Sequence, residues 1–138
     1  MSRPAVVAEL LEGPHPCCLS TLDDDGSPYV VVVWCAAEGD AVAVNAAEGR
    51  WLDNLRRDPR ASLVVLDTAN ILRYVGIDGR AVTIEPDPGH AHMNELSRLY
   101  EGRDYAYATP EDERRFKIVI EPARVRAFDL PPPDAPDG

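Results

Sequence analysis

The segment Asn45-Ala-Ala-Glu-Gly-Arg-Trp-Leu-Asp-Asn-Leu-Arg-Arg-Asp-Pro-Arg60 decides the fold, because it predicts a short helix between two strands. The apolar runs at residues 41–44 and 61–66 on either side of it have the length of strands. Trp51 and Leu55 are four residues apart and share one helical face. Asp58-Pro59 ends the helix, since a residue that precedes proline is disfavoured in the helical region.

The same helix gathers cations in an acidic chain. The formal net charge is −10, yet Arg56, Arg57 and Arg60 cluster here, with Arg50 at the start of the helix. The planar fork of donors on arginine suits phosphate or carboxylate, so an anionic ligand is one interpretation. The other is a solvated helix face whose arginines interact with the C-terminal end of the helix dipole.

The regions around this segment predict a mainly β protein with short helices. Strands are expected at residues 17–22, 29–35, 41–44, 61–66 and 71–84, with a bulge or bend at Asp78-Gly79. A last strand covers 116–120 and 125–128, with an interruption at Glu121-Pro122. Helices are expected at residues 4–12 and 90–101. This order of elements is typical of a small closed or partly closed β-barrel.

Length and composition predict a single domain over residues 1–129, followed by a disordered proline-rich tail over 130–138. No apolar run approaches the roughly 18 residues of a membrane span, and the N-terminus lacks the layout of a secretory signal, so a cytoplasmic location is expected. The acidic balance argues against a nucleic-acid partner. The three cysteines, Cys17, Cys18 and Cys35, are interpreted as reduced thiols on strands.

Strand 29–35 contains the run Val30-Val-Val-Val33, which is apolar on both of its faces. One face can cover the core, and the other would be exposed in a monomer. A homodimer is therefore expected, with a second copy of the chain covering the outer face. The histidines at positions 15, 90 and 92 lack the spacing of metal ligands, so no metal site is predicted.

Five fragments occur in the order of a known family: Leu19-Ser-Thr-Leu22, Gly26-Ser-Pro-Tyr-Val-Val-Val-Val-Trp34, Asn54-Leu-Arg-Arg-Asp-Pro-Arg-Ala-Ser-Leu63, Arg73-Tyr-Val-Gly-Ile-Asp-Gly-Arg80 and Leu96-Ser-Arg-Leu-Tyr-Glu-Gly-Arg-Asp-Tyr105. Over residues 5 to 128 the chain resembles the pyridoxamine 5'-phosphate oxidase-like split β-barrel flavoproteins, in the branch that binds flavin or the deazaflavin coenzyme F420. The resemblance implies an FMN-binding type of split β-barrel. It also implies a homodimer with the cofactor ring in a groove between the subunits and its phosphate on the strand-to-helix segment.

The cofactor-binding residues expected on these grounds are Val31, Val32, Val33, Asn45, Arg50, Trp51, Asn54, Arg56, Arg57, Arg60 and Arg73. The chain departs from the family pattern at two places. Trp51 stands where similar proteins commonly carry lysine, and Val31-Val32-Val33 stands where they often carry Thr-Pro-Val. Arg50 could replace the missing lysine, whereas Trp51 is expected to lie beside the cofactor ring.

Coenzyme F420 is the favoured cofactor, because its polyglutamate tail needs more cations than one phosphate does. The pattern formed by Leu96, Tyr100, Gly102 and Tyr105 also resembles the F420 branch, although it could equally mark a helix that ends in a left-handed glycine. The implied reaction is hydride transfer to an electron-poor C=C or C=N bond of a small molecule, with Tyr74, Tyr105 and Tyr107 as candidate proton donors. The alternatives are an FMN-dependent oxidoreductase and a non-catalytic protein that binds a cofactor or haem.

Overall fold

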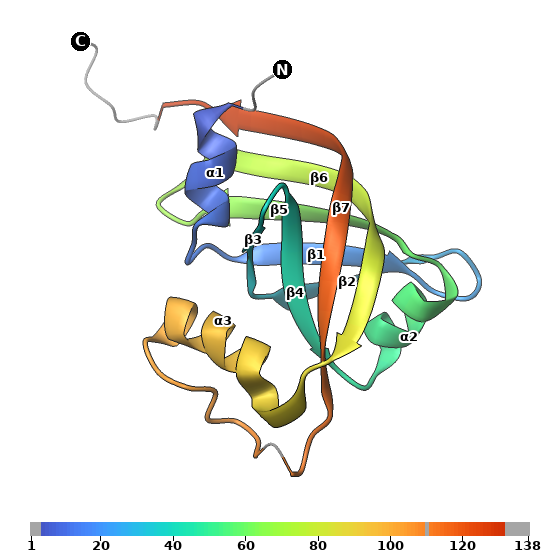
Figure 1. The fold of residues 1–138 in the computed structure, drawn as a ribbon. Helices are drawn as coiled ribbons and strands as arrows, with labels where there is room; N and C mark the ends of the chain where they lie inside the picture. The colour runs from blue at the N-terminus through green and yellow to red at the C-terminus, as the bar shows by residue number, and fades with distance from the viewer. Residues whose placement is uncertain (1–3, 110, 132–138) are drawn as a thin grey trace.

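The computed structural model describes residues 4–109 and 111–131 (Figure 1). The elements in chain order are α1 (Ala5–Leu11), β1 (Cys17–Leu22), β2 (Pro28–Val33), β3 (Cys35–Glu38), β4 (Ala41–Ala47), α2 (Arg50–Arg57), β5 (Arg60–Asp67), β6 (Asn70–Pro86), the 3-10 turn η1 (Pro88–His90), α3 (Ala91–Glu101) and β7 (Arg115–Asp129). The mainly β architecture with short helices is confirmed. Most of the tail expected at 130–138 lies outside the described residues, whereas the backbone N–H of Leu130 donates to the Leu72 carbonyl.

All seven strands form one antiparallel sheet in the order β2-β1-β5-β6-β7-β4-β3. The two edge strands, β2 and β3, are consecutive in the chain, with only Trp34 between them. The sheet therefore curls into a split barrel. The prediction of one strand over 29–35 is corrected to two strands, because the chain crosses at Trp34 from the β1 ladder to the β4 ladder. At the crossing, the Tyr100 hydroxyl accepts the Cys35 N–H at 3.1 Å.

The bend predicted at Asp78-Gly79 is confirmed by a register shift between these two residues in the β6–β7 ladder. A Cβ atom on Gly79 would lie 2.3 Å from the Glu121 carbonyl oxygen, so only glycine fits there. The interruption predicted at Glu121-Pro122 is wrong, since β7 runs continuously from Arg115 to Asp129. The strand tolerates the proline because β4 pairing ends at Ile120 and the bulge lies directly opposite.

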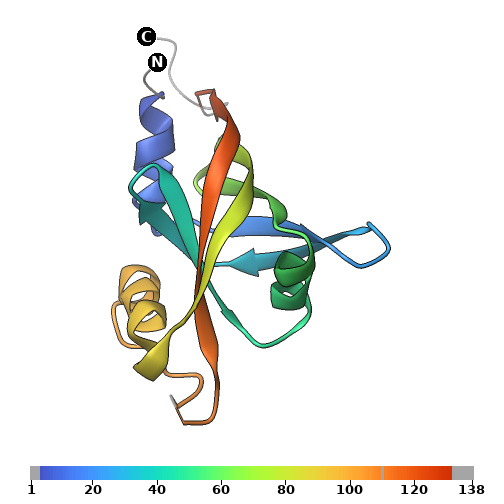
Figure 2. The same cartoon turned by 45° about the vertical axis from the view of Figure 1, so that its right-hand side comes forward.

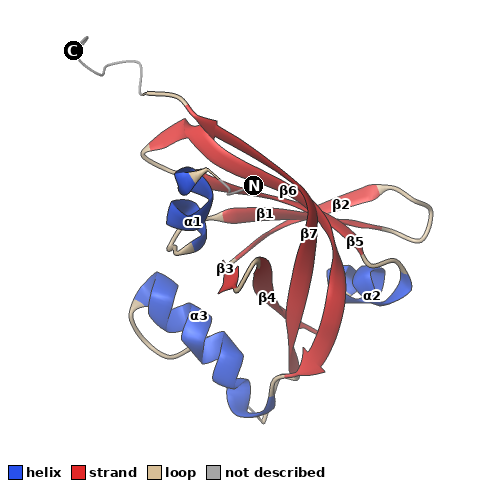
Figure 3. Ribbon diagram, turned by 45° about the horizontal axis from the view of Figure 1, so that its top comes forward, coloured by secondary structure: helices blue, strands red, loops and turns tan. Residues whose placement is uncertain are grey.

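The barrel interior is an apolar core that includes Leu19, Leu63, Ile77 and Ile118. The helices lie outside the sheet (Figures 2 and 3): α1 contacts β3, β5, β6 and β7, α2 contacts β1, and α3 contacts β7. Cys17 and Cys35 are free and buried, whereas Cys18 is only partly buried. No helix among the described residues is long and apolar enough to cross a membrane.

Strand β2 alternates as the valine run predicts. Val31 and Val33 pack against the core, whereas Val30 and Val32 are 61% and 73% exposed. The register places Val32 beside Cys18, and Cys18 beside Val64 of β5. The outer face of this part of the sheet therefore carries exposed apolar side chains in a single copy of the chain.

Candidate cofactor site

An aromatic pocket opens where β2 gives way to β3 and where β4 leads into α2. Its volume is about 340 Å³, at the small end of the roughly 300–1,000 Å³ typical of ligand sites. Four aromatic side chains belong to its wall: Trp34, Trp51, Tyr105 and Tyr107. The other lining residues are Val32, Val33, Asn45, Ala47, Glu48, Gly49, Met93 and Arg115.

The aromatic wall is built from three separate segments. Trp34 stacks on Tyr100 of α3 with ring centroids 5.3 Å apart, and it meets Tyr105 edge-on with centroids 6.4 Å apart. Tyr105 also contacts Tyr107, at 5.3 Å between centroids. Trp51, on the first turn of α2, lines the pocket and also packs against the core. Such a wall suits a planar ring system, because flat apolar faces can stack on it.

A buried polar network forms one side of this pocket. The Nε of Arg115 donates to Asn45 Oδ1 at 2.7 Å. The Asn45 amide nitrogen lies 3.1 Å from Asp87 Oδ2 and 3.0 Å from His92 Nδ1. Asp87 in turn accepts the backbone N–H groups of His92 and Met93 at the start of α3. The network therefore ties β4, β7 and α3 together beside the pocket.

These contacts determine the tautomer of His92. Arginine can only donate and an ionised aspartate can only accept, so the Asn45 amide must present its oxygen to Arg115 and its nitrogen to Asp87. The same amide nitrogen faces His92 Nδ1, which must accept and is therefore unprotonated. Burial and the nearby Lys117 lower the pKa of His92, which agrees with a neutral imidazole.

The first turn of α2 adjoins the aromatic pocket. Its N-cap, Gly49, has no capping side chain, and the first helical bond runs from Asp53 N–H to the Gly49 carbonyl at 3.0 Å. The earlier N–H groups of the helix have no intrahelical acceptor, and they carry the positive end of the helix dipole. This turn is the strand-to-helix segment expected to hold phosphate.

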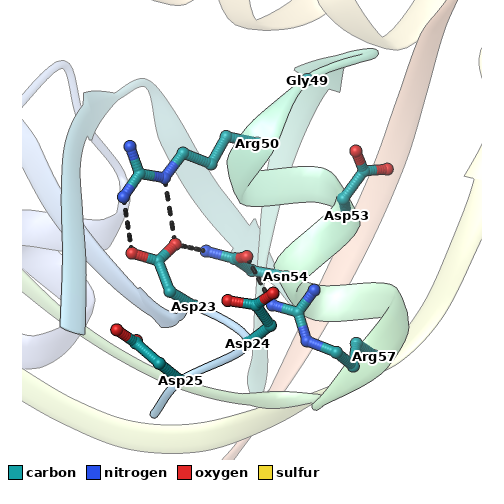
Figure 4. A pocket seen from close by; sticks show the side chains of 8 residues that line it. All are labelled: Asp23, Asp24, Asp25, Gly49, Arg50, Asp53, Asn54 and Arg57. Carbon is teal, nitrogen blue, oxygen red and sulfur yellow. Dashed lines mark hydrogen bonds and ion pairs between the residues drawn. The ribbon is translucent and has the colours of Figure 1, made fainter. Parts of the chain in front are cut away.

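Gly49 also lines a second, larger pocket of about 580 Å³, which we call the acidic pocket (Figure 4). Its remaining lining residues are Asp23, Asp24, Asp25, Arg50, Asp53, Asn54 and Arg57. Arg50 makes two hydrogen bonds to Asp23, at 3.0 and 2.6 Å. Arg50 and the Asn54 amide lower the pKa of Asp23 to about 2. Four carboxylates against two guanidinium groups make this pocket a poor anion site.

The other arginines of the predicted anion site are also paired. Arg56 bonds to Glu48 and Asp53, and Arg60 bonds to Asp58. Arg57 donates to the Leu22 carbonyl and to Asn54 Oδ1. The arginines that cluster in the sequence are therefore neutralised locally, largely by carboxylates from the β1–β2 turn and from α2 and its ends.

The expected site residues fall into three groups. The aromatic pocket gathers Val32, Val33, Asn45, Trp51, Tyr105 and Tyr107, and the acidic pocket gathers Arg50, Asn54 and Arg57. The remainder line neither pocket: Val31 packs against the core, Arg56 and Arg60 lie on exposed faces, and Arg73 and Tyr74 lie on β6.

Arg73 and Tyr74 lie away from both pockets, because they stand near the start of the long strand β6. Arg73 pairs with Glu9 of α1, Asp67 and Asp129. Tyr74 stacks on Phe128 with ring centroids 4.7 Å apart. Both residues lie at the α1 end of the barrel, contrary to expectation, because the strand begins there and reaches the α3 end only near Pro86 (Figure 1).

The pattern of Leu96, Tyr100, Gly102 and Tyr105 is mostly structural. Leu96 is buried, and Gly102 is a left-handed C-cap with φ 74°. The Tyr100 hydroxyl accepts from Cys35 N–H and donates to the His15 carbonyl at 2.7 Å. Only Tyr105 reaches the pocket.

Sequence reasoning missed six residues of the aromatic pocket, and the two with the clearest chemical role are Trp34 and Arg115. Trp34 stood inside a predicted strand, where nothing showed that the chain changes ladder. Arg115 opens β7 and meets Asn45, 70 residues away in the sequence. A weak signal was present, since Arg115 and Lys117 alternate with the buried Phe116 and Ile118 and must face away from the barrel core.

Comparison with known proteins agrees with this architecture. Residues 4–129 match the family described as pyridoxamine 5'-phosphate oxidase. A solved F420 reductase is 30% identical with a TM-score of 0.76, and the match covers 86% of this chain and 94% of that chain. A conserved hypothetical protein from Mycobacterium tuberculosis is 23% identical, with a TM-score of 0.75 and coverage of 99% and 93%.

General Stress Protein 26 from Bacillus anthracis str. Sterne is 19% identical, with a TM-score of 0.68 and coverage of 91% and 93%. The last two similarities establish the fold alone. No protein of curated function matches the chain. The family match spans nearly every described residue, and the split barrel is the fold it calls for, so this chain belongs to the pyridoxamine 5'-phosphate oxidase family.

Proposed function

We propose that this protein is an F420-dependent oxidoreductase that transfers a hydride to an electron-poor C=C or C=N bond of a small molecule. The observation that carries the proposal is the aromatic pocket, which offers a planar ring four aromatic neighbours and the partly buried guanidinium of Arg115. The 30% identity to an F420 reductase supports the choice of cofactor.

The residues present fit such a group. The wall of Trp34, Trp51 and Tyr105 suits the deazaflavin ring, and the uncapped first turn of α2, with Arg50 beside it, suits the phosphate. When bound, the cofactor supplies the hydride. The protein's own contribution is to stack the ring, fix its edge and exclude water with the apolar side chains of the pocket.

Tyr105 is the better placed of the tyrosines for donating a proton to the product. Its hydroxyl makes no hydrogen bond to the described residues, whereas its backbone N–H donates to Asn94 Oδ1. The Tyr107 hydroxyl already donates to Glu101 at 2.9 Å, and Tyr74 lies outside the pocket. A free phenol at the wall can give its proton without first breaking another bond.

The site is proposed to be completed by a second copy of the chain. Val32 lines the aromatic pocket and is also 73% exposed on the outer face of β2. A homodimer that covers this face would deepen the open pocket and shield the ring from water. A pocket of about 340 Å³ in one chain is small for a complete cofactor, which agrees with a groove shared between subunits.

An FMN-dependent oxidoreductase is the second candidate, and the acidic pocket favours it. The F420 tail carries several carboxylates, which the cluster of Asp23, Asp24, Asp25 and Asp53 would repel. FMN has a single phosphate, for which the free N–H groups at the first turn of α2 are the proposed donors. At the α2 segment, the two candidates differ in the negative charge that the tail of the cofactor carries.

A fluorescence titration decides between them. The chain has two tryptophans, and both line the aromatic pocket. A ring bound there quenches their emission, and the variants Trp34→Phe and Trp51→Phe each remove part of the signal. We expect quenching that saturates with F420 at lower concentration than with FMN. Tighter FMN binding would select the second candidate, and a Soret band in the purified protein with no quenching by either cofactor would indicate a haem-binding protein instead.

A further inference from the structure

Arg115 is a partly buried arginine that is ion-paired with Glu113 and has unused hydrogen-bonding capacity. Its side chain is 10% exposed. The Nε donates to Asn45, and Nη1 lies 2.9 Å from Glu113 Oε2. That carboxylate oxygen receives no hydrogen bond of acceptable geometry. The Nη2 group donates to no described residue, while the guanidinium carbon lies 5.2 Å from the centre of the Tyr105 ring.

Arg115 lines the aromatic pocket, whereas the arginines of the predicted anion site do not. The Arg50 side chain is 61% exposed and makes two hydrogen bonds to Asp23. Arg115 instead lines the aromatic pocket together with Trp34 and Tyr105, and among the described residues its Nη2 group has no acceptor. A ligand acceptor at this wall would form a charge-assisted hydrogen bond with it, which is stronger than a bond between neutral groups.

We propose that Arg115 binds the negatively charged edge of a planar, conjugated ligand that stacks on the wall formed by Trp34 and Tyr105, so that the pocket selects conjugated anions. The guanidinium is held in place by Asn45, and its planar fork can donate to two oxygens at once. This inference uses the pocket of the proposed function, but it does not depend on which cofactor binds.

Two sources could present this chemistry. One is the deazaflavin ring, whose phenolic hydroxyl ionises to a delocalised anion that the FMN ring lacks. The other is a substrate that carries a conjugated carboxylate, for which cinnamate is a suitable probe. Cinnamamide has the same shape without the charge, so the pair isolates the anionic edge in the wild-type protein.

The test combines these probes with a matched pair of variants. Arg115→Gln removes the partly buried cation, and Arg114→Gln removes the neighbouring one, which is exposed and lies over the Phe116 ring. Affinities for F420, FMN, cinnamate and cinnamamide are measured by calorimetry. We expect Arg115→Gln to weaken an anionic ligand about tenfold or more, as loss of a charge-assisted hydrogen bond does, and Arg114→Gln to change little. Arg115→Lys should recover part of the affinity.

The ligands that lose affinity identify the source. If Arg115→Gln weakens the binding of F420 more than that of FMN, the ligand of Arg115 is the ionised deazaflavin ring. If it weakens only the binding of cinnamate, the ligand is a substrate carboxylate. Unchanged affinities in Arg115→Gln overturn the proposal. If that variant does not fold, equal binding of cinnamate and cinnamamide to the wild-type protein, together with equal effects of Arg115→Lys on F420 and FMN, overturns it. Binding of cinnamate through Arg115 without binding of either cofactor would support this inference while removing the proposed function.

Discussion

Replacing Asn54 with alanine decides whether this residue binds the cofactor or holds the fold. Its side chain is buried and bonds to Thr21 Oγ1 at 3.1 Å and to Asp23 Oδ1 at 2.9 Å. It also accepts from Arg57 at 2.7 Å. Asp23 and Arg57 reach water and can be rehydrated in the variant, whereas Thr21 is 1% exposed and its hydroxyl would lose a buried partner.

A buried polar group left unsatisfied costs about 1–3 kcal/mol, and the two partly hydrated contacts add a smaller amount. We therefore expect Asn54→Ala to lower the free energy of unfolding by about 2–3 kcal/mol, which lowers the Tm by roughly 6–12 °C for a chain of this size. The assay is urea unfolding followed by tryptophan fluorescence, with F420 and FMN affinities measured on the folded variant.

Arg56→Ala is the matched control, because Arg56 lies on the same helix in exposed ion pairs. Such pairs contribute about 0–1 kcal/mol, so this variant should unfold close to the wild type. The reasoning is refuted if Asn54→Ala keeps wild-type stability and loses cofactor affinity, since Asn54 would then contact the ligand.

Three further predictions concern the pocket, its pH dependence and the outer face of the sheet. Trp51→Lys should tighten phosphate-bearing ligands, because a cation then lies beside the first turn of α2, and should lower the Tm through lost packing; a lower Tm with unchanged affinity would make Trp51 a core residue only. The depressed pKa of His92 means that the unfolded chain takes up a proton first, so the free energy of unfolding should fall as the pH drops below the unfolded pKa of 6.5. The groups facing His92 are Lys117, Asp87, Glu95 and Glu38, and a flat stability profile in chemical denaturation between pH 7 and pH 5 would contradict its neutral state. The double variant Val30→Asp/Val32→Asp should be monomeric in light scattering, and a wild-type protein with the 15.1 kDa mass of one chain would remove the dimer.

The sequence by itself determined the local features, because they depend on a few neighbouring residues. The left-handed Gly102 at the end of α3, the bend at Gly79 and the alternation of Val30 to Val33 all follow from backbone freedom or from the period of a strand. The order of strands and helices followed from the same signals and already indicated a closed or partly closed barrel, and the family resemblance then specified a split β-barrel.

Only the tertiary structure decided which charges are paired and which line the pocket. The arginines of the α2 segment look like an anion site in the sequence, but the fold brings Asp23 from the β1–β2 turn against Arg50 and Glu48 against Arg56. Arg115 looks like an ordinary strand residue, yet the pairing of β4 with β7 places it beside Asn45 at the wall of the aromatic pocket. Charge is paired by proximity in space, which the sheet order sets and no local pattern encodes, so the chemistry of the site emerges only when distant strands meet.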